Sequence, residues 1–498
     1  MAIVGGGING VGIARDAAGR GLSVFLAEAN DLGGATSSSS SKLIHGGLRY
    51  LEYREFRLVR EALAEREVLR ASAPHIVTPM RFVLPHVPAM RPRLLIQLGL
   101  FIYDHLSHRS TIPASAAVNL TSSYSGAPLL DIYRRGFTYW DCWADDARLV
   151  IINARAASKL GADIRTRTSC IGAKRHNKHW LLRLRNEATG NTYEILARGL
   201  INAAGPWVGQ VLTGIDTGNH QASSANLRLI KGSHIVVPRF AGCNGDDAYI
   251  LQNNDGRVVF VLPFESRFLL IGTTDVPYEG NPQDVCIDDN ETKYLLNIVG
   301  RFFKHSPALK DIIWSFSGVR PLYNDNDTLS ASAVTRDYRL ELDNKENKPP
   351  LLTVIGGKLT TYRRLAEEAL EKLAPSLNIT RSAWTASEKL PGGDLPGPDL
   401  ESYTEDLMKR FQNWDRQLIA GLVRRHGSCT ENVIGDAQKL EEMGKHIGND
   451  LYEREVVYMS INEWAKTPED VLWRRTKTGV HLLPSERRVA FDAVAKIL

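Results

Sequence analysis

Three glycines near the N-terminus have the spacing of a dinucleotide-binding loop. Gly5, Gly7 and Gly10 fit the pattern G-x-G-x-x-G between an apolar run and a helical pattern, and Glu28 closes the next apolar run. In this context Gly5 allows a tight turn, Gly7 lets the backbone approach a pyrophosphate, and Gly10 allows close packing of a helix on a strand. The helix N-terminus offers N–H groups to the phosphates, and Glu28 would accept hydrogen bonds from a ribose. The stretch therefore predicts a bound dinucleotide.

A second group of polar residues follows a run of serines at residues 37–41. Lys42, His45, Arg49 and Tyr50 stand within nine residues of sequence, around a Gly-Gly pair. A flexible linker is the other interpretation of a serine run, but it does not account for these side chains. We interpret the segment as a loop that holds polar groups near a ligand.

A second strand–glycine–helix junction lies far along the chain. An apolar run at residues 351–355 ends in Gly356, Gly357 and Lys358, and a helical pattern follows. Because a helix N-terminus after glycines favours an anion, this junction is a second candidate anion site.

Two kinds of strand, together with helices, must position these residues. Near-continuous apolar runs are typical of parallel strands covered on both faces, whereas a period of two is typical of half-buried strands. The patterns predict strands at 1–4, 22–27, 164–170, 180–186, 193–198 and 351–355, and helices at 8–18, 55–71, 141–159 and 363–373. Segments 233–240, 248–253, 257–265 and 267–276 predict an antiparallel sheet. The first strand is unusually short.

Composition excludes several classes of protein. The 498 residues are 43% hydrophobic and 23% charged, so we expect two or three ordinary globular domains. A net charge of +5 is too small to indicate nucleic-acid binding, and it is compatible with an anionic substrate or lipid surface. The five cysteines show no C-x-x-C pattern, which argues against a disulfide framework and against a metal site. We expect them to be small buried residues.

The longest strongly apolar run, at residues 94–103, is about half the ~20 residues that cross a bilayer. We therefore expect neither a membrane span nor a signal peptide. The run is either a buried helix or an apolar segment, flanked by basic residues, that enters a membrane surface.

A proline- and glycine-rich segment at residues 390–398 predicts a linker. The residues beyond it, 399–498, have helical patterns and no glycine-rich motif. They predict a helical C-terminal domain that serves packing, dimer contacts or support of a lid.

The motifs at residues 5–10, 40–50, 201–207, 317–321 and 356–363 occur together and in this order. Together they closely resemble the FAD-dependent sn-glycerol-3-phosphate dehydrogenases of the aerobic, respiratory type. The resemblance covers essentially the whole chain and implies an α/β fold. It comprises a Rossmann-like FAD-binding domain of the glutathione-reductase and D-amino-acid-oxidase type, an antiparallel substrate sheet and a helical C-terminal domain. We expect the FAD-binding domain at 1–75, 136–215 and 316–385, the substrate-binding and membrane-facing domain at 76–135 and 216–315, and the helical domain at 390–498.

The resemblance also implies which residues hold FAD. In this sequence the matching positions are Gly5, Gly7, Gly10 and Glu28 for the ADP half, Thr36, Ser37, Ser41, Lys42 and Leu43 for the pyrophosphate and flavin side, and Ala204, Gly205, Gly357, Lys358, Leu359 and Thr360 for the rest of the pocket. Ala204 stands where relatives often carry threonine.

The implied reaction is oxidation of glycerol 3-phosphate to dihydroxyacetone phosphate, with electrons passed to ubiquinone or menaquinone. The family further implies a homodimer bound peripherally to the cytoplasmic face of the inner membrane.

Such a reaction requires positive charge for the phosphate and the developing alkoxide, and a base for the hydroxyl proton. Arg320, Arg336 and Lys358 are the candidates for the charge, with Arg49 and Tyr50 as secondary candidates. His45 is the first candidate for the base and His234 the second, and the alternative role for each is only to orient the hydroxyl group.

Three alternatives remain at this point. A glycerol-3-phosphate oxidase, or another D-amino-acid-oxidase-like enzyme, would pass electrons to oxygen. A flavin-binding regulator would perform no reaction. A nicotinamide enzyme is disfavoured, because the sequence holds one Rossmann fingerprint and FAD would occupy it.

Overall fold

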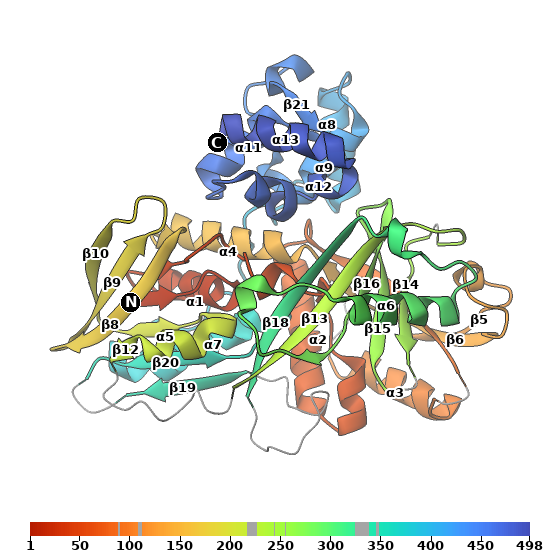
Figure 1. Ribbon diagram of the computed structural model, residues 1–498, viewed down its shortest axis with the longest axis horizontal. Coiled ribbons are helices and arrows are strands. Elements are labelled where there is room, and N and C mark those ends of the chain that lie inside the picture. The colour runs from red at the N-terminus through yellow and green to blue at the C-terminus, as the bar shows by residue number, and fades with distance from the viewer. Residues whose placement is uncertain are drawn as a thin grey trace.

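The computed structural model describes residues 1–87, 90–107, 112–216, 227–243, 245–253, 255–323, 338–344 and 348–498. Two sheet-built regions lie side by side, and a helical C-terminal domain, blue in Figure 1, stands over one side of them. This arrangement agrees with the α/β class and the helical C-terminal domain that the sequence predicts.

The first sheet carries the glycine motif. Its strands lie in the order β19-β20-β11-β1-β2-β7, and all neighbours except β19 and β20 are parallel. The predicted short strand exists and is central to the sheet, between β11 and β2. The strand bounds are Ala2–Val4 for β1, Phe25–Ala27 for β2, Asp163–Arg165 for β7, Leu200–Asn202 for β11, Arg339–Asp343 for β19 and Leu351–Ile355 for β20.

Three helices pack on this sheet through one apolar core. They are α1 (Ile8–Gly19), α4 (Asp146–Lys159) and α7 (Tyr362–Leu377). Ile3, Val11, Leu149 and Leu365 are fully buried members of that core. The helix predicted at 141–159 begins later than expected, because residues 141–144 belong to a strand.

A smaller sheet has the order β10-β9-β8-β12. The single strand predicted at 164–170 is in fact two strands in two sheets: β7 joins the first sheet, and β8 joins this one. The bounds are Thr168–His176 for β8, His179–Asn186 for β9, Thr192–Ala197 for β10 and Ile215–Asp216 for β12, and the short helix α5 (Val208–Thr213) precedes β12.

The largest sheet forms the second region. Its order is β17-β13-β16-β15-β14-β4-β6-β3, with β18 also paired to β13 and β5 to β6. Antiparallel pairing of the four predicted segments is confirmed, whereas β14 and β4 are parallel. The bounds are Leu43–Ile44 (β3), Val77–Pro85 (β4), Ala116–Asn119 (β5), Arg135–Ala144 (β6), Leu227–Pro238 (β13), Ala248–Gln252 (β14), Val258–Phe264 (β15), Phe268–Gly272 (β16), Val276–Pro277 (β17) and Trp314–Tyr323 (β18).

The strands of this sheet come from several of the ranges into which the sequence divides the chain. Strands β3, β6 and β18 lie in the large sheet, whereas the sequence assigned residues 1–75, 136–215 and 316–385 to the dinucleotide-binding part. The reason is that each pairs with a strand distant in sequence, and pairing over such distances leaves no local signal.

Helices α2 (Phe56–Ser72), α3 (Arg93–His105) and α6 (Asp289–Phe302) flank the large sheet. The apolar run 94–103 forms most of α3, and its interpretation as a buried helix is wrong. Leu94, Leu98 and Phe101 are 82%, 52% and 58% exposed, and only Leu100 and Tyr103 of this helix are buried. Among the described residues, no helix is both long enough and apolar enough to cross a membrane.

The C-terminal domain has its own apolar core. Its helices are α8 (Leu400–Arg410), α9 (Arg416–His426), α10 (Thr430–Ile434), α11 (Glu453–Asn462), α12 (Thr478–His481) and α13 (Pro484–Ile497), with a hairpin of β21 (His446–Gly448) and β22 (Leu451–Tyr452). Buried ion pairs of Arg148 with Glu463 and of Asp145 with Lys477 attach it to the N-terminal end of α4.

The cysteines are all reduced. Cys142, Cys243 and Cys429 are buried as expected, but Cys170 is half-buried and Cys286 is exposed. Cys286 follows a turn beside the N-terminus of α6, where no core covers it.

Candidate active site

A cavity of about 1200 Å³ runs from the glycine loop to the large sheet. It exceeds the ~300–1,000 Å³ of most small-molecule sites, as an extended dinucleotide requires. Residues from many separate parts of the chain line it, within 4–9, 27–50, 168–172, 203–215, 281–285, 317–322 and 356–360, together with Arg185, Gly232, His234 and Thr273. The site therefore brings together the motifs that the sequence singles out.

The backbone of the glycine loop has a positive φ and approaches neighbouring carbonyl groups closely, and both features require glycine. Gly5 has a φ of +109°, and a Cβ there would lie 2.5 Å from the carbonyl oxygen of Ala203. A Cβ at Gly10 would lie 1.9 Å from the carbonyl oxygen of Gly5, so Gly10 serves close packing and does not itself line the cavity. Gly5 and Gly7 line it, beside the N-terminus of α1. The predicted division of roles among the three glycines fits this geometry.

Glu28, at the end of β2, lines the cavity and is half-buried. Its Oε2 accepts a hydrogen bond of 2.6 Å from the Gly6 N–H, and its Oε1 accepts one of 2.8 Å from the Asn30 N–H. Burial raises the pKa of Glu28, and these two N–H groups act against the rise. The carboxylate oxygens keep further lone pairs for a ligand, because each accepts only one of these bonds.

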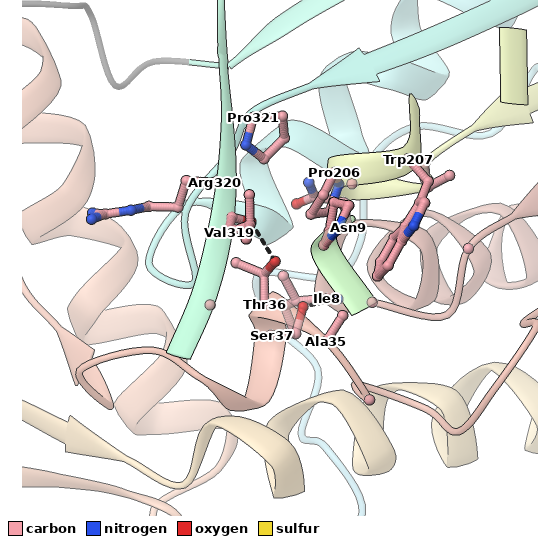
Figure 2. A pocket seen from close by; sticks show the side chains of 18 of the residues that line it. Ile8, Asn9, Ala35, Thr36, Ser37, Pro206, Trp207, Val319, Arg320 and Pro321 are labelled. Atoms are coloured by element: carbon pink, nitrogen blue, oxygen red, sulfur yellow. Dashed lines mark hydrogen bonds between the residues drawn. The ribbon is translucent and has the colours of Figure 1, made fainter. Parts of the chain in front are cut away.

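The serine loop is tied to the large sheet. The Thr36 hydroxyl donates a 2.6 Å hydrogen bond to the carbonyl oxygen of Val319 in β18, which Figure 2 shows as a dashed line. The Ile8 N–H donates to the Ser37 hydroxyl at 3.0 Å. Thr36, Ser37, Ser41 and Leu43 all line the cavity as predicted.

Lys42 differs from the prediction. Its ammonium is buried, 2.6 Å from Asp146 Oδ1, and it donates a second bond to the carbonyl oxygen of Ser38. A buried ammonium needs a paired carboxylate, so the side chain turns toward α4 and is absent from the cavity lining. Lys42 stabilises the serine loop from behind.

The two candidate histidines both line the cavity. His234 is buried, stacks on Phe316, and lies 2.9 Å from the Ser41 hydroxyl through Nε2. Burial, with the cations Lys42 and Arg320, lowers the pKa of His234 to about 3, so the ring is neutral. His45 is half-buried, and its backbone N–H donates to the Thr360 hydroxyl at 3.2 Å.

Two of the predicted cations, Arg320 and Lys358, line the cavity. Arg320 lines it and pairs with Asp275 at 2.6 Å. Lys358 and Tyr50 line it too, with the Lys358 ammonium 4.2 Å from the centre of the Tyr50 ring. In Figure 2 Arg320 extends from β18 away from Pro206 and Trp207. Arg320 and Lys358 therefore bring two cationic side chains to the cavity lining, one from each sheet region.

Two predicted residues are not fully described. Arg336 lies outside the described residues. The backbone of Arg49 lies in the 3₁₀ helix Leu48–Tyr53, and its side chain is outside the described part of the structure.

Comparison with known proteins identifies the family. Residues 1–363 match the model of the FAD-dependent oxidoreductases, and residues 383–498 match the model for the C-terminal domain of alpha-glycerophosphate oxidase. The chain is 52% identical to a glycerol-3-phosphate dehydrogenase of Pseudomonas aeruginosa, covering 98% of this chain and 93% of the relative. It is 49% identical to the aerobic glycerol-3-phosphate dehydrogenase of Escherichia coli, over 97% and 94%.

The chain belongs to the family of FAD-dependent glycerol-3-phosphate dehydrogenases.

Two other relatives extend the comparison. A D-erythritol 1-phosphate dehydrogenase of Brucella abortus is 50% identical, over 97% of this chain and 95% of the relative. The crystal structure of a glycerol-3-phosphate dehydrogenase from Bacillus halodurans with FAD superposes with a TM-score of 0.77 at 25% identity, covering 99% of this chain and 90% of that one.

The cavity of this family member fits FAD. Gly205 has a φ of +55° with open space where a Cβ would lie, and a Cβ at Gly7 would crowd only Ser37. Two buried polar atoms in cavity-lining residues, Asn9 Oδ1 and His234 Nδ1, have no hydrogen-bond partner among the described residues. Buried polar groups are normally satisfied, so these atoms suit a bound ligand or its water.

Several cavity residues were not singled out from the sequence. Asn9 and Trp207 stand inside recognised motifs, which is a usable signal. Residues 168–172 and Arg185 carry no signal, because β8 and β9 reach the cavity only through tertiary packing. Asp275, which pairs with Arg320 but does not itself line the cavity, was also missed, because it lies in the connection between β16 and β17, distant in sequence from Arg320.

Proposed function

We propose that the protein oxidises sn-glycerol 3-phosphate to dihydroxyacetone phosphate with FAD as the hydride acceptor. The observation that carries this proposal is one cavity that joins a dinucleotide loop to Arg320, Lys358 and two histidines. The family supports it, since relatives about 50% identical are glycerol-3-phosphate dehydrogenases.

Bound FAD supplies the hydride acceptor, and the side chains of this chain supply the remaining requirements. Arg320 presents a planar fork that suits a phosphate, and Lys358 adds a point charge. Arg49, Tyr50 and Arg336 are further proposed substrate contacts from the sequence. The positive charge of these two side chains also stabilises the alkoxide that develops as the hydroxyl proton leaves.

We assign the base role to His45 and the orienting role to His234. A base works best with a pKa near the working pH, and the pKa of His234, at about 3, is far below it. A neutral His234 held by Ser41 is suited to hydrogen bonding with the substrate hydroxyl.

D-Erythritol 1-phosphate is a second candidate substrate, because the Brucella abortus relative is as similar as the glycerol-3-phosphate dehydrogenases. Both candidates are polyol phosphates, so the same cations serve either. The discriminating experiment is a comparison of kcat/KM for the two phosphates, with glycerol as the uncharged control. We expect glycerol 3-phosphate to be preferred and glycerol to be inert; preference for the erythritol phosphate would reassign the substrate, and activity on glycerol would contradict phosphate recognition.

The electron acceptor in this proposal is ubiquinone or menaquinone in a membrane. Helix α3 supports it with three exposed apolar side chains, Leu94, Leu98 and Phe101, spaced so that they share one face. Arg91 and Arg93 at its start suit anionic headgroups. We propose that α3 binds the protein peripherally to a membrane, and the family resemblance alone suggests the cytoplasmic face of the inner membrane and a homodimer. Stoichiometric peroxide during turnover in air would instead indicate an oxidase.

A further inference from the structure

We infer that the C-terminal domain holds the FAD site in shape through Asp31, which makes Arg474 and Arg475 positioning residues for the cofactor. The inference concerns cofactor binding and does not depend on which polyol phosphate is the substrate.

Asp31 lies in a loop that has two faces. Six residues of this loop line the cavity: Ala29, Asn30, Gly33, Gly34, Ala35 and Thr36. Asp31 and Leu32 do not line it, and they are 2% and 0% exposed. The loop therefore forms a wall of the cavity with one face and is buried on the other.

Two arginines of the C-terminal domain hold the buried face. Arg474 Nε donates to Asp31 Oδ2 at 2.6 Å, and Arg475 Nη2 donates to Asp31 Oδ1 at 2.8 Å. A second nitrogen of Arg475 bonds Asp31 Oδ2. Paired N–H groups of this kind fix the orientation of a carboxylate as well as its charge.

Arg167, in the connection from β7 to β8, completes the network. Its Nη2 lies 2.8 Å from Asp470 of the C-terminal domain, and its Nη1 lies 3.7 Å from Asp31. Its backbone N–H donates to the carbonyl oxygen of Asn30 at 2.9 Å. Burial would raise the pKa of Asp470, but Arg474, Arg475 and Arg167 outweigh it and lower that pKa to about 2. The loop is thus held both at the Asp31 side chain and at the Asn30 backbone.

The loop is in turn bonded to the phosphate-binding glycines. The Gly33 N–H donates to the carbonyl oxygen of Gly6 at 3.0 Å. The Gly6 N–H donates to Glu28, where the loop begins. A shift of Asp31 therefore moves the backbone that approaches the pyrophosphate and the acid that faces the ribose.

Another ion pair between the C-terminal domain and the rest of the chain lies away from the cavity. It serves as a control that distinguishes support of the FAD site from attachment of the domain in general. Arg424 of α9 pairs with Glu265 at 2.7 Å, which also links the C-terminal domain to the rest of the chain. Glu265 lies after β15, and neither it nor its neighbours line the cavity.

The test compares Arg474→Gln, Arg474→Lys and Asp31→Asn with Arg424→Gln in the full chain. The dissociation constant of FAD is measured by quenching of flavin fluorescence on reconstitution of each apoprotein, and the melting temperature of each apoprotein is measured in parallel. Arg474→Gln leaves Arg475 on Asp31, so it is the variant expected to fold even where Asp31→Asn does not.

Arg474→Gln removes the bonds of Arg474 to both Asp31 and Asp470, and we expect it to weaken FAD binding about tenfold. Arg474→Lys should lie between it and the original protein, and Arg424→Gln should bind FAD unchanged. With FAD at saturation, kcat should return to its original value in all variants. An unchanged FAD dissociation constant in Arg474→Gln, or equal weakening in Arg424→Gln, would overturn the inference.

Discussion

The two cavity-lining histidines differ in their surroundings, and this difference sets their proposed roles. His234 is buried between Phe316 and Ser41, with two cations near it. His45 is less buried and belongs to the loop that Thr360 holds.

Replacement of each histidine by asparagine separates the roles. His45→Asn should bind FAD but reduce it with substrate roughly 10²–10⁴-fold more slowly, the usual contribution of a general base. The loss in His234→Asn should be smaller, because asparagine retains hydrogen bonding. Stopped-flow absorbance of the flavin measures both rates, and an unchanged rate in His45→Asn would remove it from the mechanism.

Arg320 is expected to act on the substrate phosphate. Arg320→Gln should raise KM for glycerol 3-phosphate about 10- to 100-fold, as expected from loss of hydrogen bonds to a charged group. Arg257→Gln is the control, because Arg257 also pairs with an aspartate in the large sheet but does not line the cavity. Steady-state kinetics measures KM for glycerol 3-phosphate in both variants. An equal rise in KM in the two variants would contradict the assignment of Arg320 to the phosphate.

The sequence predicted site residues where the backbone itself makes the site. Gly5, Gly7 and Glu28 belong to one strand–turn–helix–strand unit and Gly357 to a second strand–glycine–helix junction, so local spacing was enough to find these cavity-lining residues. Lys42 was misplaced because its partner Asp146 is distant in sequence, and no local pattern shows that a lysine is already paired.

At the scale of elements, α3 carries the clearest unpaired apolar face among the described helices. The sequence showed its apolar residues but not which side of the helix the core covers. The same limit applies to β6 and β18, which pair in the large sheet with strands distant in sequence, because a strand pattern does not identify its partner.

Replacement of both Leu98 and Phe101 by serine should reduce binding of the protein to liposomes. Loss of two exposed apolar side chains removes roughly 3 kcal/mol of burial in lipid, which is more than a tenfold weaker partition. Leu309→Ser, an exposed leucine outside α3, is the control. Co-sedimentation with anionic vesicles gives the result, and undiminished binding of the double variant would exclude this surface.

At the scale of the whole molecule, acid should weaken the attachment of the C-terminal domain. Burial would raise the pKa of Glu463, but the Arg148 guanidinium outweighs it, and the pKa is about 2 in the folded chain. A lowered carboxyl pKa stabilises the fold above the ordinary value near 4.5 and loses that effect as the pH falls toward 2.

We expect this one group to contribute about 3 kcal/mol of the stability lost across that range. Glu463→Gln should be less stable at pH 7, because Arg148 then lacks its carboxylate, and should lose less stability on acidification. Denaturant unfolding at pH 7, 5, 4 and 3 tests this, because the last two values lie between the two pKa values. Parallel losses in the two proteins would show that Glu463 does not titrate as described.

The predicted separation between a cofactor-binding region and a substrate-binding region is also a feature of the whole molecule. One sheet region presents the glycine loop, the other presents Arg320 and His234, and the cavity lies where they meet. The serine loop joins the regions through Thr36 and Val319.

The central claim is that this cavity lets a polyol phosphate reduce bound flavin. An anaerobic titration of the purified FAD-loaded protein with glycerol 3-phosphate tests it most directly. We predict that the flavin absorbance bleaches with one substrate molecule per flavin and that glycerol at the same concentrations causes no bleaching. A flavin that stays oxidised in excess glycerol 3-phosphate would contradict the account.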